Sequence, residues 1–315
     1  MIIATCPLRV SLFGGSTDNP FFVQNYGYGS VISFTCDLKT YVTIHEDKIG
    51  YNNHLYKFVI NYSNREQVSS YDAIQNDVVR VVLKHFSSNP MAVSLTSDIY
   101  SQGSGLASSS SYIIALIKAI SIKNNLNLTD SNICSLAYDL ERQFNPYCGY
   151  QDPYGCGIGG FKRIEFYRDK PVKYSFLPDD FFYLYDTHLV FTGVNRNSKG
   201  VLQNISENIE KSKGLLPIVD KAELALIEKD YSTFLDLINE SWIVKKQTSN
   251  LITENEIVSD IDSVLSKNTS ILAHKLCGAG NGGFYLVFSE KGKLKLDIPY
   301  VKININTSGV EGLRI

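Results

Sequence analysis

Short runs of β-branched and aromatic residues alternate with glycine, asparagine and aspartate along the first hundred positions. Runs of this kind predict β-strands that end where the turn-forming residues begin. The predicted strands are residues 2–5, 10–13, 31–34, 38–44, 55–60 and 91–96. Because hairpin-like strand runs at the front of the chain are followed by a mixture of helical and strand patterns, the predicted fold class is α+β.

Helical periodicity begins near Ser108 and returns after Thr129, a residue type that often caps a helix N-terminus. The apolar positions at helical spacing are Ile113, Leu116, Ile117 and Ile120 in the first helix, and Ile133, Leu136, Ala137 and Leu140 in the second. Glu141 lies one residue beyond the second apolar face, at a helix C-terminus. The helix dipole disfavours negative charge there, so this acid needs another reason to be present.

A loop is predicted at residues 155–160 and a strand at 160–166, followed by a polar stretch with a proline from 168 to 180. The chain has 315 residues, more than one hydrophobic core usually holds, so we expect two domains, 1–175 and 176–315. The second half has predicted strands at 182–192, 284–288 and 302–305, and predicted helices at 199–213, 220–245 and 254–266. We find no internal repeat.

The overall composition is that of a globular protein, with 44% hydrophobic and 20% charged residues. A formal net charge of −2 gives no electrostatic reason to expect nucleic acid or an anionic membrane as a partner. Residues 1–10 resemble neither a signal peptide nor an anchor, and the apolar stretch 112–120 is too short to span a bilayer. We therefore expect a cytoplasmic protein. Six cysteines without CxxC spacing and five scattered histidines predict reduced thiols and no structural metal site.

The strongest chemical signal is the segment QGSGLASSSS at 102–111, which runs directly into the first predicted helix. Its glycines allow the backbone to approach a ligand closely, and the helix N-terminus provides unpaired N–H groups and a positive dipole end. The segment therefore predicts a phosphate-binding loop. The alternative is a flexible Gly/Ser loop with a serine N-cap, but such a linker would not continue into a well-patterned helix. The segment matches neither the P-loop nor the dinucleotide-binding fingerprint.

A second glycine-rich loop, CGAGNGGF at 277–284, has more glycines than a hairpin requires. The excess indicates close packing of backbone against a ligand or another loop, and the alternative is a tight turn. Asp152 follows Glu141 by eleven residues. Two acids near a phosphate loop suit metal-assisted phosphoryl transfer, one holding Mg²⁺ and the other orienting or deprotonating the attacking hydroxyl. Two solvated surface acids are the alternative.

Three segments together resemble the GHMP kinases, in the family's order: PLRVSLFGGSTD at 7–18, the serine loop at 103–111 and the glycine loop at 278–283. The resemblance covers nearly the whole chain. It implies a first domain like domain 2 of ribosomal protein S5, with a left-handed crossover, and a ferredoxin-like second domain. ATP and substrate would meet in the cleft between them.

The resemblance also implies roles for individual residues. Asp152 matches the catalytic aspartate, and Arg9 a basic residue that stabilises it as an anion. Ser109, or its neighbour Ser108, and Glu141 match the Mg²⁺ ligands. The implied ATP-phosphate contacts are Gly103, Ser104, Gly105, Leu106, Ala107, Ser108, Ser109 and Ser110. The implied substrate contacts are Arg9, Gly15, Ser16, Thr17, Asp18, Gln151, Asp152, Arg196 and Gly280.

The first motif also bears on the substrate. Galactokinases have Glu-His before Thr-Asp, where this chain has Gly15 and Ser16, so galactose would lose two polar contacts. The motif, with GYQDPYGCGIGGF and FTGVNRNSKGVL, resembles the D-glycero-D-manno-heptose 7-phosphate kinases, which act on the anomeric hydroxyl. Arg196, with Lys199 near a helix start, could bind a substrate phosphate, and a solvated loop charge is the alternative. Ser16, where that subfamily usually has glycine, and Asn281, within the last glycine run, depart from the pattern.

Three functions remain open from the sequence. The first is an ATP- and Mg²⁺-dependent kinase that phosphorylates the anomeric hydroxyl of a sugar phosphate. The second is a GHMP kinase for another sugar or a sugar acid. The third is a catalytically silent sugar sensor of the same fold, although a sensor does not need Arg9, Ser109, Glu141 and Asp152 together. The expected partner is a small sugar or sugar phosphate, and the expected assembly is a monomer or homodimer.

Overall fold

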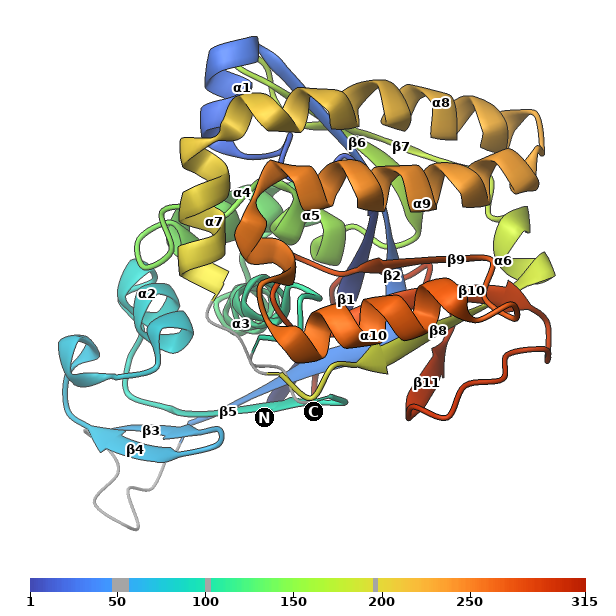
Figure 1. Ribbon diagram of the computed structural model, residues 1–315. Helices are drawn as coiled ribbons and strands as arrows, with labels where there is room; N and C mark the ends of the chain where they lie inside the picture. The colour runs from blue at the N-terminus through green and yellow to red at the C-terminus, as the bar shows by residue number, and fades with distance from the viewer. Residues whose placement is uncertain (47–56, 100–102, 195–197) are drawn as a thin grey trace.

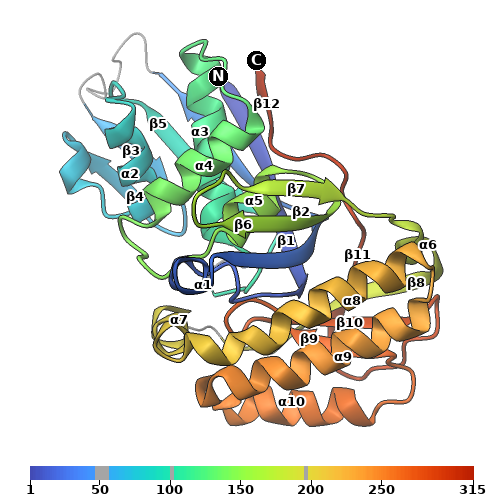
Figure 2. The ribbon, with the colours of Figure 1, turned by 90° about the horizontal axis from the view of Figure 1, so that it is seen from above.

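The structure is a computed structural model that describes residues 1–46, 57–99, 103–194 and 198–315. Two sheets, each covered by helices, form the fold (Figures 1 and 2). The first sheet has eight strands, in the order β12-β1-β2-β5-β3-β4, with β6 paired to β2 and β7 paired to β6. These strands are β1 (Ile2–Phe13), β2 (Tyr28–His45), β3 (Phe58–Asn61), β4 (Arg65–Val68), β5 (Ala92–Ser97), β6 (Phe161–Tyr167), β7 (Lys173–Phe176) and β12 (Glu311–Arg314).

The second sheet has four antiparallel strands in the order β11-β8-β10-β9. They are β8 (Tyr185–Phe191), β9 (Ala273–Leu276), β10 (Phe284–Glu290) and β11 (Tyr300–Ile303). Numbered along the chain, this order is fourth, first, third, second, as in a ferredoxin-like sheet. The segment between β10 and β11, residues 291–299, contains no helix. The predicted α+β class is confirmed by this mixture of sheets and helices and by the structural neighbours described below.

Helices connect the strands of both sheets. They are α1 (Pro20–Tyr26), α2 (Asp77–His85), α3 (Ser108–Lys123), α4 (Asp130–Glu141), α5 (Gln151–Gly157), α6 (Asp180–Leu184), α7 (Ser198–Glu207), α8 (Leu216–Ile227), α9 (Tyr231–Thr248) and α10 (Glu256–Lys267), with 3₁₀ turns η2 (Tyr71–Ala73), η3 (Ile209–Leu215) and η4 (Asn250–Thr253). Thr129 caps α4 as expected, in a capping box with Asn132. In the part of the chain that the structure describes, no helix is long and apolar enough to cross a membrane.

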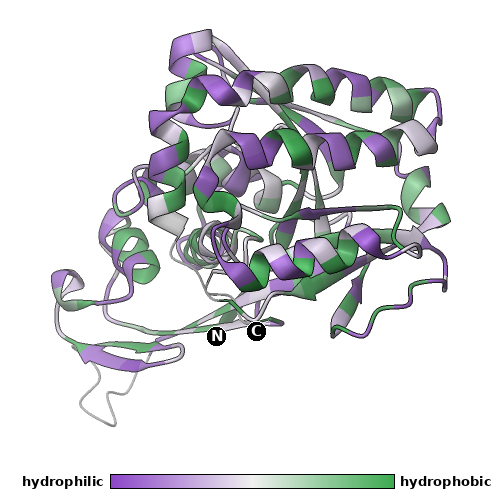
Figure 3. Cartoon of the chain, in the orientation of Figure 1, coloured by the Kyte–Doolittle hydropathy of each residue, from purple (hydrophilic) through white to green (hydrophobic). Residues whose placement is uncertain are grey.

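The hydrophobic core joins the two sheets. Helix α3 packs against the first sheet, and residues Ile113 to Ala119 are buried on all faces except at Lys118. A second cluster combines Leu12 of β1, Phe234 of α9 and Leu286 of β10. By contrast, α10 lies at the surface and carries green and purple residues side by side in Figure 3, as an amphipathic helix does. Because one cluster spans both sheets, the facing loops are held in fixed positions.

Several predicted elements differ from the structure. The strands predicted at 2–5 and 10–13 form one strand, β1, because a register shift between Pro7 and Arg9 lets the strand bend without ending. Those predicted at 31–34 and 38–44 likewise form β2. The helix predicted at 220–245 is two helices, since Lys229 adopts a positive φ of 58° between α8 and α9. The first residues of the strand predicted at 182–192 belong to α6.

The loop predicted at 155–160 is helical over its first half, where α5 extends to Gly157. Its glycines serve packing. A Cβ at Gly155 would lie 3.1 Å from Cγ of Arg9, and one at Gly157 would lie 2.4 Å from Sγ of Cys134. The boundary between domains near residue 175 stays a prediction. The final strand, β12, pairs with β1 and so returns to the first sheet.

Candidate active site

A cavity of about 750 Å³ lies where the two halves of the chain meet. Its walls come from β1, the loop before α3, the start of α5, helices α7 and α9, and the second glycine loop. Thirteen of the predicted site residues line it: Arg9, Gly15, Ser16, Asp18, Gly103, Ser104, Gly105, Ala107, Ser108, Ser109, Glu141, Gln151 and Asp152. Residues far apart in the sequence therefore share one space.

The loop before α3 has the backbone of an anion-binding turn. Gly103 and Gly105 have positive φ angles of 72° and 81°, and Ala107, at the N-cap of α3, has a φ of 63°. The Ser104 and Ser108 hydroxyls lie 2.9 Å apart and lock the loop onto the first turn. Because no side chain caps α3, its first N–H groups are directed to the cavity side without a side-chain acceptor. This geometry suits a phosphate group.

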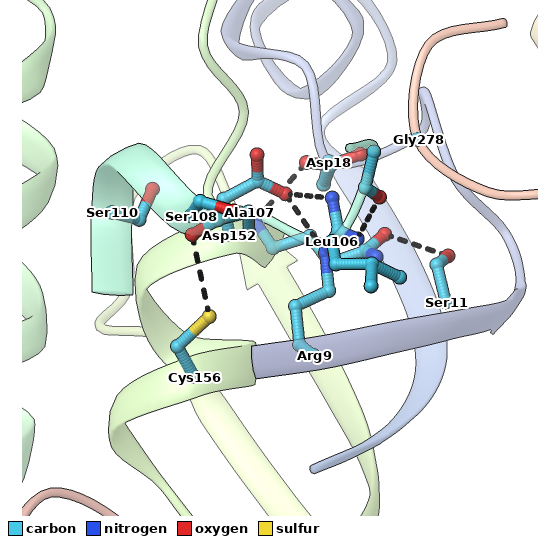
Figure 4. Close-up of polar contacts among 12 residues, drawn as sticks. Arg9, Ser11, Asp18, Leu106, Ala107, Ser108, Ser110, Asp152, Cys156 and Gly278 are labelled. Carbon is cyan, nitrogen blue, oxygen red and sulfur yellow. Dashed lines mark hydrogen bonds and ion pairs between the residues drawn. The ribbon is translucent and has the colours of Figure 1, made fainter. Parts of the chain in front are cut away.

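Arg9, which is buried, and Asp152, which is partly exposed, form an ion pair on the cavity wall (Figure 4). Arg9 donates from Nε at 3.1 Å and from NH2 at 2.7 Å to the same oxygen, Oδ1 of Asp152. Its NH1 donates at 2.7 Å to the carbonyl of Gly105 in the phosphate loop. Burial lowers the pKa of Arg9, but the charge and hydrogen bonds of Asp152, together with two nearby cysteines, raise it by more, so the net pKa is raised. The guanidinium therefore stays charged and ties the acid to the loop.

Glu141 is a buried carboxylate in the same cavity, only 3% exposed. The Ser110 hydroxyl donates to its Oε2, and Ser109 also contributes a side-chain hydrogen bond. Burial, and next the negative charge of Asp152, raise the pKa of Glu141 to about 7. Glu141 therefore stands at the end of α4, where the helix dipole disfavours a negative charge, because its carboxylate faces the cavity and the Ser110 hydroxyl.

Asp18 holds the substrate motif in shape. Its Oδ1 accepts from the backbone N–H of Ser16 at 3.0 Å, and its Oδ2 accepts from that of Gln151 at 3.0 Å. Burial, followed by the charge of Asp152, raises the pKa of Asp18 to about 6. The Ser11 hydroxyl donates to Gln151 at 3.2 Å. This side of the cavity is therefore lined by carboxylate, amide and hydroxyl groups, which suit a polyhydroxylated ligand.

The second glycine loop packs backbone to backbone on the phosphate loop. A Cβ at Gly283 would lie 2.4 Å from the carbonyl oxygen of Ser104, and the Phe284 N–H donates to that oxygen at 3.2 Å. The close packing expected from the glycine excess is thus present. Asn281 has a φ of 60°, a conformation that asparagine tolerates, and accepts from the Asn255 N–H at 3.1 Å. Asn281 therefore fits this loop although the family pattern has glycine at the position.

Four predicted contact residues do not line the cavity. Thr17 is fully buried and its hydroxyl donates to the carbonyls of Gly14 and Ser30. Leu106 belongs to the hydrophobic core, and Ser110 faces Glu141. A Cβ at Gly280 would lie 2.8 Å from Ile252, so a glycine at this position lets the loop pack closely on η4. The residues of this loop that line the cavity are Gly278 and Ala279. Arg196 lies outside the described residues, as does the side chain of Lys199.

Sequence reasoning missed several residues that line the cavity: Ser11, Asn19, Asn76, Asp77, Tyr112, Leu202, Ile205 and Lys245. Ser11 and Asn19 lie in or beside a motif and could have been proposed from their polarity. Leu202, Ile205 and Lys245 lie within helices α7 and α9, where no motif marks them. They reach the cavity only because the second half of the chain folds over the first.

The donor set fits a Mg²⁺ ion. Glu141 and Ser109 both line the cavity beside the phosphate loop, and both offer oxygen. Mg²⁺ is usually held by one or two protein carboxylates together with substrate phosphates and water. A carboxylate whose burial already disfavours its charge gains from a neighbouring cation.

Comparison with known proteins agrees with this geometry. Residues 73–160 match the family model of the GHMP kinases N terminal domain. Over 98% of both chains, the protein is 28% identical to the D-glycero-alpha-D-manno-heptose 7-phosphate kinase of Campylobacter jejuni. It is 25% identical to a mevalonate kinase of Thermococcus onnurineus, over 92% of this chain and 90% of that one.

Solved structures show the same fold. A crystal structure described as a D-glycero-D-manno-heptose 1-phosphate kinase from Bacteroides thetaiotaomicron superposes with a TM-score of 0.78 at 21% identity, covering 100% of this chain and 99% of that one. The galactokinase of Lactococcus lactis in complex with galactose superposes with a TM-score of 0.75 at 17% identity, covering 98% and 95%. At these identities the likeness concerns the fold alone.

Proposed function

We propose, from the premise that the chain is a kinase of the GHMP family, that it transfers the γ-phosphoryl group of ATP to the anomeric hydroxyl of a sugar phosphate, D-glycero-D-manno-heptose 7-phosphate. The observation that carries this proposal is the Arg9–Asp152 pair, bonded to the phosphate loop at Gly105 and sharing one cavity with Glu141. A carboxyl group paired with an arginine directly beside a phosphate-binding turn is the arrangement that phosphoryl transfer to a hydroxyl requires.

In the proposed reaction, the anomeric oxygen attacks the γ-phosphorus of ATP. The bond from that phosphorus to the β–γ bridging oxygen breaks, and ADP leaves. Asp152 accepts the hydroxyl proton at Oδ2, since Arg9 holds Oδ1. Arg9 holds the carboxylate in place through two hydrogen bonds to Oδ1 and offsets negative charge near the transferred group. The Gly103–Ser109 turn holds the nucleotide phosphates by backbone N–H groups.

Glu141 and Ser109 are the residues proposed to hold Mg²⁺, which supplies charge neutralisation of the nucleotide phosphates when bound. Ser110 positions the Glu141 carboxylate from the first turn of α3. Both side chains are buried, which strengthens the contact between them.

The polar substrate side supports a sugar over a less hydroxylated acceptor. Asp18, Gln151 and Ser11, which are joined by hydrogen bonds, give polar groups on one side of the cavity that also contains Asp152. The heptose phosphate is proposed because the relative at 28% identity is named for it and because the first motif resembles that subfamily.

A substrate panel tests the proposal. The protein is incubated with ATP and Mg²⁺ and with heptose 7-phosphate, heptose, galactose or mevalonate, and ADP release is measured. We expect turnover with heptose 7-phosphate, and ³¹P NMR of the product should show a second phosphate on the anomeric oxygen. Turnover of only an unphosphorylated acceptor would show that the substrate is not a sugar phosphate. Ligand binding without ADP release on any acceptor would show that the protein is a sensor and not a kinase.

A further inference from the structure

Lys245 is a buried cation on the cavity wall for which the proposed reaction has given no role. It lies near the C-terminal end of α9, is 6% exposed and lines the cavity with Arg9 and Asp152. Its Nζ donates to the carbonyl of Gly278 in the second glycine loop. The ammonium is therefore held on the cavity wall beside the second glycine loop.

Two other buried lysines show what a purely structural lysine looks like here. Lys162 donates to the carbonyls of Gly155 and Gly160, and Lys275 donates to that of Leu12. Burial lowers the pKa of both to about 8, and neither lines the cavity. Lys245 shares their bond to a main-chain carbonyl but differs in facing the ligand space. Loop support alone does not explain that placement.

The end of α9 is connected to the substrate side. Ser249, one turn after Lys245, donates to Asn204 of α7 at 2.6 Å. In turn, Asn19 at the end of the substrate motif donates to Ser206 of α7 at 2.9 Å. Helix α7 itself adds apolar groups to the cavity wall. Lys245 thus belongs to the wall that continues through α7 to the substrate motif.

The charge balance of the cavity calls for such a cation. Four acids line it: Asp18, Asp77, Glu141 and Asp152. All three guanidinium nitrogens of Arg9 donate to Asp152 or Gly105. A doubly charged phosphate ester entering beside these acids would be repelled unless a second cation met it. Within the described residues, Lys245 is the other lysine or arginine on the wall.

We propose that Lys245 binds the phosphate group that the sugar substrate already carries before transfer. This inference rests on the proposed function and names the contact by which the enzyme would select a phosphorylated sugar. A lysine ammonium is a compact point charge that suits a phosphate monoester, and the Gly278 carbonyl fixes where it points. Discrimination between a sugar phosphate and the same sugar without phosphate then comes from this contact.

The test compares Lys245→Met with wild type on heptose 7-phosphate and on unphosphorylated heptose, with ADP affinity measured by calorimetry. We expect KM for heptose 7-phosphate to rise roughly ten- to hundredfold, the worth of one charge-assisted hydrogen bond. KM for heptose and the Kd of ADP should stay within about twofold of wild type. Lys245→Arg should recover part of the loss, since it restores the charge with a different shape.

Lys246→Met is the matched control, because Lys246 pairs with Asp262 at 2.8 Å and does not line the cavity. It should leave all three constants unchanged. Equal loss on both sugars, or weaker ADP binding alone, would overturn the role of Lys245. Failure of wild type to turn over any sugar phosphate refutes the proposed function instead, whereas normal turnover by wild type and Lys245→Met alike refutes only this inference.

Discussion

Replacing Glu141, the carboxylate proposed to hold Mg²⁺, by glutamine should stabilise the protein at alkaline pH. The carboxyl is 3% exposed, and burial together with the charge of Asp152 raises its pKa from 4.5 to about 7. Because the folded-state pKa lies above the unfolded value, the folded state holds the proton more tightly. Stability from this group is complete below pH 4.5 and is lost as pH rises through about 7.

The size of the effect follows from the difference between the two pKa values. Each pKa unit corresponds to 1.36 kcal/mol, so a rise from 4.5 to about 7 costs about 3 kcal/mol once the group is ionised. Glutamine keeps the shape and a hydrogen-bonding oxygen for Ser110 without the charge. The Glu141→Gln variant should therefore be more stable than wild type by about 3 kcal/mol at pH 8, and nearly equal to it at pH 5.

Urea unfolding of both proteins at pH 5 and pH 8, without nucleotide or divalent cation, measures this difference. Glu240→Gln on α9 is the control, since Glu240 is exposed and its loss should leave the pH dependence unchanged. The pKa of Asp18 is also raised, to about 6, so Asp18 makes its own contribution to the pH dependence of stability. This contribution is present in every variant and cancels when the variants are compared. A Glu141→Gln variant with the same pH profile as wild type, or one less stable at pH 8, would refute the reasoning.

Three other changes test the site. Asp152→Asn should lower kcat by about two orders of magnitude or more and leave the Kd of ADP nearly intact, because a positioned proton acceptor is lost; steady-state kinetics and calorimetry measure both. Gly283→Ala places a Cβ 2.4 Å from the Ser104 carbonyl and should weaken ADP binding at least tenfold, whereas Gly292→Ala, with nothing within 4 Å, should leave it unchanged. Ser16→Gly should raise the free energy of unfolding by about 1 kcal/mol in urea, because Ser16 has a φ of 84°.

The sequence predicted the parts of the site that motifs carry. The serine loop and the helix after it follow from local pattern, and the two acids from their spacing and the family resemblance. That Asp152, Glu141 and Ser109 share one cavity was predicted from the resemblance, and the structure places them so. Lys245 could not be found in this way, because a lysine within an amphipathic helix usually faces solvent. Its burial depends on the packing of α9 against the second glycine loop.

Secondary structure was predicted least well where glycine serves packing and where pairing outweighs local signals. Gly155 and Gly157 predicted a loop, but they are small so that Arg9 and Cys134 can approach a helix. A break was predicted between residues 5 and 10, but pairing with β2 carries the strand through it. In both cases the deciding contact comes from a segment distant in the sequence, and no local window contains it.

Backbone conformation offers an independent way to locate the site. Among the described residues, six that are not glycine have a positive φ. Three of them lie just after helices α2, α3 and α8, where a left-handed residue commonly ends a helix: Ser87, Asn125 and Lys229. The other three are Ser16, Ala107 and Asn281. These lie one each on the substrate motif, the phosphate loop and the second glycine loop. Strain in these three loops, away from any helix C-terminus, is expected where the backbone is fixed for a ligand and not for folding.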